Sequence, residues 1–180
     1  MQRGFNLLEV FFVIFIAAVF LIIAARLYSY YVWVGEKTQF KNSVAVLRHA
    51  LNDYYYHHCN VDLPTQNVSY ADVIAFIPGG FRTSIYNPWA LNQADAFSFQ
   101  IIKNADGIHM LKLTAVTRYS AANLVETVNA TAAENGRLVW EWLPNQLIEK
   151  VENPLWIMSN NLQLYKNLSE ENVQPNYCRV

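Results

Sequence analysis

Charge is scarce in this chain. Asp, Glu, Lys and Arg make up only 15% of its 180 residues, and the formal net charge is −1. Proteins that bind nucleic acid or anionic lipid through a general electrostatic attraction carry an excess of basic residues. The composition shows no such excess, so we predict no nucleic-acid partner.

Cysteine is scarce too, and the chain has only Cys59 and Cys178. His57 and His58 come directly before Cys59, but no second group of Cys or His stands at the spacing of a zinc site. Adjacent residues on a helix do not face one another, so we interpret the two histidines as polar residues that close a helix. No Gly-x-Ser-x-Gly motif frames a nucleophile. We predict no metal, no cofactor, no catalytic residue and no enzymatic activity.

Polar side chains are absent from Val10 to Ala25, and no proline occurs before Pro64. As an α-helix, residues 5–25 would be about 31 Å long, which matches the hydrocarbon core of a bilayer. This apolar run is too long for a secretory signal peptide. A spanning helix would place an aromatic cluster at the membrane–water interface, composed of Tyr28, Tyr30, Tyr31 and Trp33.

Glu9 lies at the start of this apolar run. A carboxylate inside a spanning helix costs roughly 2.5–3.5 kcal/mol or more unless it is paired or protonated. Cleavage between Gly4 and Phe5 would give Phe5 a free α-amino group at a similar depth. In a stack of staggered helices, Glu9 of one subunit could then pair with Phe5 of its neighbour. An uncleaved signal anchor is the alternative, and it leaves Glu9 without this partner.

The residues around this junction resemble a known processing site. Residues 3–9 read RGFNLLE, and this run is similar to the prepilin peptidase site of type IV pilins and type II secretion pseudopilins. The resemblance implies cleavage after Gly4, N-methylation of Phe5 and a role for Glu9 in filament assembly. The sequence departs from the family pattern at Asn6, where Thr or Ser is common, and at Arg26, where many pilins have a helix-bending proline.

The resemblance also implies partners and a location. The partners would be other pilin subunits, the prepilin peptidase, an inner-membrane assembly platform with its ATPase, and the lipid bilayer before assembly. The chain would cross the bacterial inner membrane once, with a cytoplasmic N-terminus and a periplasmic head, and would then enter a pilus or a periplasmic pseudopilus. The alternative is a periplasmic binding or enzymatic domain held by an uncleaved anchor.

Beyond the apolar run, apolar residues recur at intervals of four and three, which indicates one face of an amphipathic helix. They are Phe40, Val44, Leu47, Leu51 and Tyr54. The sequence therefore predicts a continuous helix over residues 5–58, about 80 Å long. We expect residues 1–4 to be a leader, residues 5–25 to form the membrane or filament core, and residues 59–180 to form the head.

The head pattern predicts a helix followed mainly by antiparallel strands. We expect a helix over 70–76 capped by Ser69, strands over 97–103 and 108–114 joined by a turn at 104–107, an Ala-rich helix over 120–135 and a strand over 137–143. Weaker patterns indicate strands at 154–159 and 162–165. This order predicts the α+β class, with the long helix packed on an antiparallel sheet as in the pilin fold.

Two further features bear on the kind of pilin. Asn87-Pro88-Trp89 is similar to a run in the heads of type IVb pilins, although Ala90 replaces the glycine expected there. Major pseudopilins coordinate calcium near the C-terminus, but the tail of this chain offers only Glu170 and Glu171 in place of a full set of oxygen ligands. Three roles stay open, a major pilin, a minor pilin and a secretion pseudopilin, and among them we favour a minor or atypical pilin.

Exported chains tend to pair their cysteines, so we favour a disulfide between Cys59 and Cys178 over two free thiols. It would close a loop of about 120 residues, for which a chain-entropy estimate gives roughly 4–5 kcal/mol of stabilisation.

Overall fold

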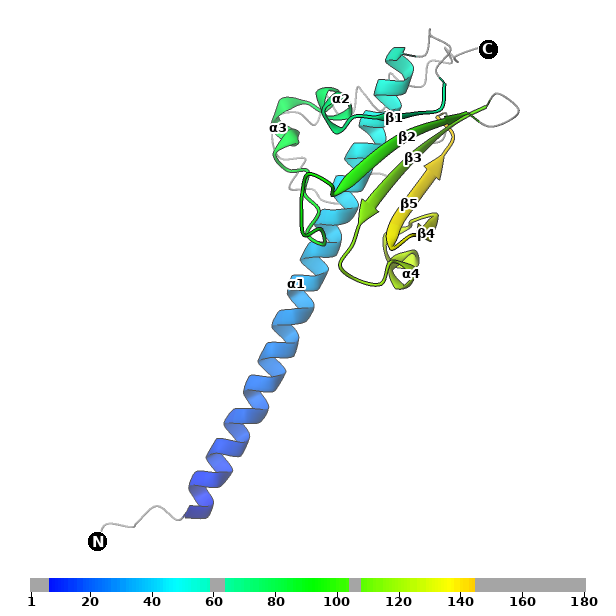
Figure 1. Ribbon diagram of the computed structural model, residues 1–180. Coiled ribbons are helices and arrows are strands. Elements are labelled where there is room, and N and C mark those ends of the chain that lie inside the picture. The colour runs from blue at the N-terminus through cyan, green and yellow to red at the C-terminus, as the bar shows by residue number, and fades with distance from the viewer. Residues whose placement is uncertain (1–6, 59–63, 104–107, 145–180) are drawn as a thin grey trace. The chain divides into compact units, whose positions relative to one another are not determined.

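The computed structural model describes residues 7–58, 64–103 and 108–144 (Figure 1). The chain divides into two compact units, Met1–Lys37 and Thr38–Val180. Helix α1 spans Leu7–His58 and contributes to both units. In the first unit it is the only regular element among the described residues.

The second unit contains the remaining elements in an α+β arrangement, which confirms the predicted fold class. After α1 follow, in chain order, β1 (Gln66–Val68), α2 (Tyr70–Ala75), α3 (Gly79–Arg82), β2 (Phe97–Lys103), β3 (His109–Val116), α4 (Ala121–Leu124), the short 3-10 helix η1 (Glu126–Val128), β4 (Ala132–Glu134) and β5 (Arg137–Trp142).

The five strands form one antiparallel sheet in the order β1-β2-β3-β5-β4 (Figure 1). Burial alternates along β2 and β3, as expected for an antiparallel sheet with one face toward a core. The register places Phe99 opposite Leu113, and Leu113 opposite Trp140. Trp140 and Trp142 both lie in the core.

The second half of α1 supplies the helical side of this core. Phe40, Val44, Leu47 and Leu51 are buried there, which confirms most of the predicted face. At the end of the helix the buried residue is Tyr55, while Tyr54 is only partly buried. The Tyr55 hydroxyl lies 2.8 Å from Nδ1 of His109 on β3, so this polar contact joins the helix to the sheet.

Helix α2 begins where the sequence predicts. The Ser69 hydroxyl accepts a hydrogen bond from the backbone N–H of Asp72 at 3.1 Å and donates one to the Asp72 carboxylate. These contacts satisfy an N–H group at the helix start that has no partner within the helix. The predicted strands over 97–103, 108–114 and 137–143 are confirmed as β2, β3 and β5 within one or two residues.

The predicted helix over 120–135 is wrong. Only its first residues are helical, in α4 and η1, and β4 follows. Asn129 and Asn135 adopt positive φ values of 54° and 50°, and Gly136 has φ 74°. Consecutive positive φ values at Asn135 and Gly136 form the two-residue connection of a β-hairpin between β4 and β5. The Asn-Gly signal was present in the sequence and outweighs the helix propensity of the alanines.

Strand β1 has only three residues and was not predicted. It pairs with β2 at the edge of the sheet, where a short strand limits the exposed edge. The predicted turn at 104–107 and the predicted strands at 154–159 and 162–165 lie outside the described residues.

Candidate assembly surface

The first half of α1 exposes apolar side chains in every direction. Its large hydrophobic residues from Val10 to Val34 are all exposed except the half-buried Trp33, and Leu21 retains 71% of its accessible surface. A helix that is apolar all round requires an apolar environment along its whole circumference. Within the described chain, α1 is the one helix long and apolar enough to span a membrane. We call residues 9–34 the apolar segment.

Glu9 lies in the first turn of α1 and is exposed. A carboxylate at this position is favoured by the partial positive charge of the helix N-terminus. Arg26 is the only basic residue of the apolar segment. Because 17 residues separate the two positions, Arg26 lies about 25 Å farther along the same helix and cannot pair with Glu9. Any cation that neutralises Glu9 in an apolar environment must therefore come from outside the apolar segment.

An aromatic belt ends the apolar segment. Tyr28, Tyr30 and Tyr31 are exposed, and Trp33 is half-buried. The ammonium group of Lys37 lies 5.5 Å from the centre of the Trp33 ring, within the range of a cation–π contact. Exposed aromatic rings next to a lysine suit the boundary between lipid and water.

The residues predicted to be processed lie beside the apolar segment, but Gly4 and Phe5 are outside the described residues. Cys59 and Cys178 are also outside them, so their pairing stays a prediction. Glu9 is the predicted site residue that the structure places, at the exposed start of α1.

His58, at the end of α1, has a local structural role. Nδ1 of His58 lies 2.8 Å from the carbonyl oxygen of Tyr54, so the protonated nitrogen can satisfy one of the carbonyl groups left free at the helix end. His57 is exposed. Among residues 7–58, 64–103 and 108–144, no group of three or more His, Cys, Asp or Glu side chains could hold a metal ion.

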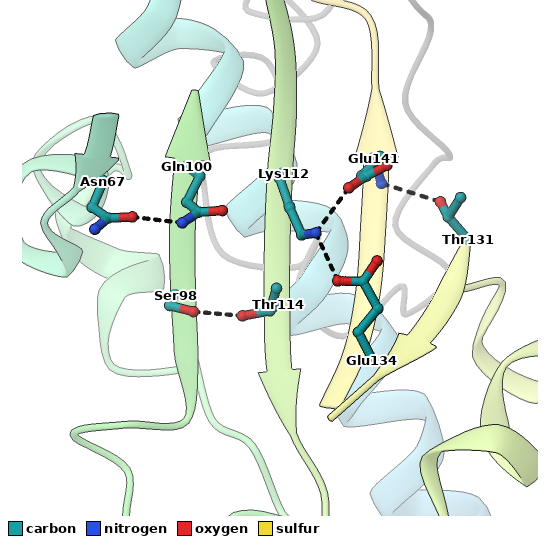
Figure 2. A network of polar contacts seen from close by, with 8 residues as sticks. All are labelled: Asn67, Ser98, Gln100, Lys112, Thr114, Thr131, Glu134 and Glu141. Carbon is teal, nitrogen blue, oxygen red and sulfur yellow. Dashed lines mark hydrogen bonds and ion pairs between the residues drawn. The ribbon is translucent and has the colours of Figure 1, made fainter. Parts of the chain in front are cut away.

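The outer face of the head sheet is polar. Figure 2 shows a row of side chains across the strands, in which Gln100 donates to Asn67 at 2.7 Å and Lys112 lies 2.9 Å from Glu141 and 2.8 Å from Glu134. The hydrogen bond to Glu134, with a further one to Glu141, raises the pKa of Lys112 although partial burial opposes it. These contacts are typical of a water-facing surface and contribute little to stability.

The Asn87-Pro88-Trp89 run serves the core. Trp89 is fully buried and stacks on Phe40 of α1 with ring centroids 4.4 Å apart. Ser43 of α1 donates to the carbonyl of Tyr86 at 2.9 Å and accepts from its N–H at 3.1 Å. These contacts hold the second half of α1 against the rest of the head. The Asn87-Pro88-Trp89 run therefore has a structural role.

Comparison of the chain with protein-family models, with curated proteins and with solved structures finds no match. The function of the chain is therefore inferred from the chemistry of the apolar segment and of the residues next to it.

Proposed function

We propose that this chain is a structural subunit, a minor or atypical pilin, of a type IV pilus-like filament. A prepilin peptidase cleaves it after Gly4 and methylates the new N-terminus at Phe5. The chain crosses the bacterial inner membrane once before assembly, with its head in the periplasm. It then leaves the bilayer and joins the filament, and it has no enzymatic activity.

One observation carries this proposal: an apolar segment exposed on all sides begins with a single carboxylate, Glu9. A bilayer and a bundle of identical apolar helices both bury such a segment. In the bilayer the run from Val10 to Ala25 would lie within a single span, and the aromatic belt would lie at its boundary. In a bundle each helix supplies the apolar environment that its neighbours need. The same segment can therefore be buried in the membrane before assembly and in the filament core afterwards.

The carboxylate supplies the specificity that apolar packing lacks. Cleavage after Gly4 creates an amine four residues before Glu9, and the amine of one subunit neutralises Glu9 of the next. Two opposite charges at one depth in an apolar core are costly when separated and tolerated when paired. The pairing therefore favours one axial register among the many that apolar helices alone would allow.

Replacing Glu9 by leucine tests the assembly role. Glu9→Leu keeps the apolar segment and should insert into the membrane at the level of the unchanged chain. Its incorporation into filaments should fall at least ten-fold, because each neighbouring amine is then buried without a partner. The measurement compares the amounts of the chain in sheared filaments and in membranes, in cells with a working assembly system.

Glu36→Leu is the matched control, because it removes the next acidic residue of α1, beyond the apolar segment. This variant should assemble normally. Equal incorporation of the Glu9→Leu and unchanged chains would contradict the pairing and would favour the alternative, a periplasmic domain on an uncleaved anchor.

A further inference from the structure

One face of α1 carries two basic side chains and two aromatic rings. Arg26, Tyr30, Trp33 and Lys37 follow one another at intervals of four, three and four residues, so they share one face of the helix. Arg26 and Tyr30 are exposed, and Trp33 and Lys37 are half-buried. All four belong to the first unit of the chain. We call these four residues the basic–aromatic face.

The two basic groups of this face lie at different levels along α1. Arg26 directly follows the run that lacks polar side chains. Side chains on a helix tilt toward its N-terminus, and the ammonium group of Lys37 accordingly lies 5.5 Å from the centre of the Trp33 ring, one turn back. Trp33 is seven residues beyond Arg26, which is about 10 Å along the helix axis. Lys37 therefore places its charge about 10 Å beyond the backbone of Arg26.

This separation suits the headgroup layer of a bilayer. A hydrocarbon core of about 30 Å within a total thickness of about 40–45 Å leaves a headgroup layer of about 5–8 Å on each side. When residues 5–25 fill the core, Arg26 lies at its edge, and Trp33 with the Lys37 ammonium group lies at the outer side of the headgroup layer. A lipid phosphate would thus lie between the two basic groups, at the level of Tyr30.

The carboxylates of the same part of α1 do not lie on this face. Among residues 9–37 they are Glu9 and Glu36. Glu9 is about 25 Å from Arg26 along the helix, at the other side of the apolar run. Glu36 is about 15 Å beyond Arg26 and about 100° around the axis from Lys37, so it points away from the basic–aromatic face. The anion that suits Arg26 must therefore come from outside this part of the helix.

We propose that the basic–aromatic face binds the phosphate of an anionic phospholipid, in the leaflet that residues 26–37 cross. The planar guanidinium of Arg26 can donate two parallel hydrogen bonds to phosphate oxygens from the hydrocarbon side. The Lys37 ammonium group attracts the same headgroup from the water side. The chain has no overall excess of basic residues, so this recognition is local to one face. The inference rests on the membrane-spanning state in the proposed function and needs neither cleavage nor assembly.

Lipid retention by the full-length chain tests this site. The chain is inserted into nanodiscs of equal amounts of phosphatidylglycerol and phosphatidylcholine, and native mass spectrometry counts the lipids that stay bound after release. Both lipids carry a phosphate, but only phosphatidylglycerol has a net negative charge. The unchanged chain should retain it at least three-fold over phosphatidylcholine. Arg26→Gln and Lys37→Gln should each lower this preference. Arg137→Gln, which removes an exposed basic residue of the head, is the control and should keep it.

Three results would overturn the lipid site. They are equal retention of the two lipids by the unchanged chain, equal preference in the Arg26→Gln and Arg137→Gln variants, and failure of the chain to enter the nanodiscs. The first two would leave the proposed filament role intact, because that role is measured separately by N-terminal processing and by incorporation into filaments. The third would contradict the membrane-spanning state as well.

Discussion

At the scale of single residues, Asn87 connects three separate parts of the head. Its side chain is fully buried, and its amide nitrogen donates to the carbonyl oxygens of Ala96 at 3.3 Å and Val116 at 2.8 Å. Its amide oxygen accepts the N–H of Trp89 at 2.9 Å. One side chain thus satisfies three backbone groups around the tryptophan that packs on α1.

Asn87→Leu should lower the free energy of unfolding by about 2–4 kcal/mol. The substitution keeps a similar volume but removes three buried hydrogen bonds, to Ala96, Val116 and Trp89. Urea unfolding of the full-length chain in detergent, followed by tryptophan fluorescence, measures the change. Asn123→Leu, at an exposed position, is the control and should change stability by less than about 0.5 kcal/mol. Equal effects of the two substitutions would show that the Asn87 contacts do not stabilise the head.

In the sequence, Asn87 stands out only because residues 87–89 resemble a run in the heads of type IVb pilins. Its hydrogen-bond partners could not be predicted, because Ala96 and Val116 are brought to it by the folding of the sheet. Glu9 differs in this respect. Its role in assembly is inferred from one local feature, an acidic residue at the start of an apolar run, and this feature can be read directly from the sequence.

At the scale of secondary-structure elements, local patterns predicted α1, α2 and the longer strands well, and the short elements between residues 120 and 135 poorly. The first half of α1 is apolar on all sides and the second half is apolar on one face. Both patterns could be recognised in the sequence, because helical periodicity depends only on neighbouring residues. Residues 120–135 contain two short helical turns and an edge strand. The strand is fixed by pairing with β5, and that pairing outweighs the propensity of its alanines.

Gly136→Ala tests the β4–β5 hairpin, which the structure shows in place of the end of the predicted helix over 120–135. Gly136 has φ 74°, which an alanine adopts only with strain, so the substitution should cost about 1 kcal/mol or more. Gly79→Ala is the control, since Gly79 begins α3, has no such φ value and has open space where a Cβ atom would lie. Thermal unfolding should show a lower midpoint for Gly136→Ala alone. Unchanged stability would contradict a left-handed conformation at this turn.

At the scale of the whole molecule, the two units meet different physical demands. The head buries a core between α1 and one face of its sheet and presents polar side chains on the other face. The apolar segment has no such cover among the described residues and needs lipid or other copies of the chain. Hydrophobicity is visible along the chain, so the sequence alone indicates which part of α1 is apolar on all sides. It did not predict that six consecutive residues of α1, 42–47, are all buried, because that burial depends on contacts between distant segments.

The mass of the N-terminal peptide tests the central claim most directly. The full-length chain would be expressed in cells with a prepilin peptidase and extracted from their membranes. Its N-terminal peptide should begin at Phe5 and carry one added methyl group, whereas a Gly4→Leu variant, made as a control, should retain residues 1–4. An unchanged chain that keeps Met1 and an unmodified Phe5 would contradict the filament-subunit account.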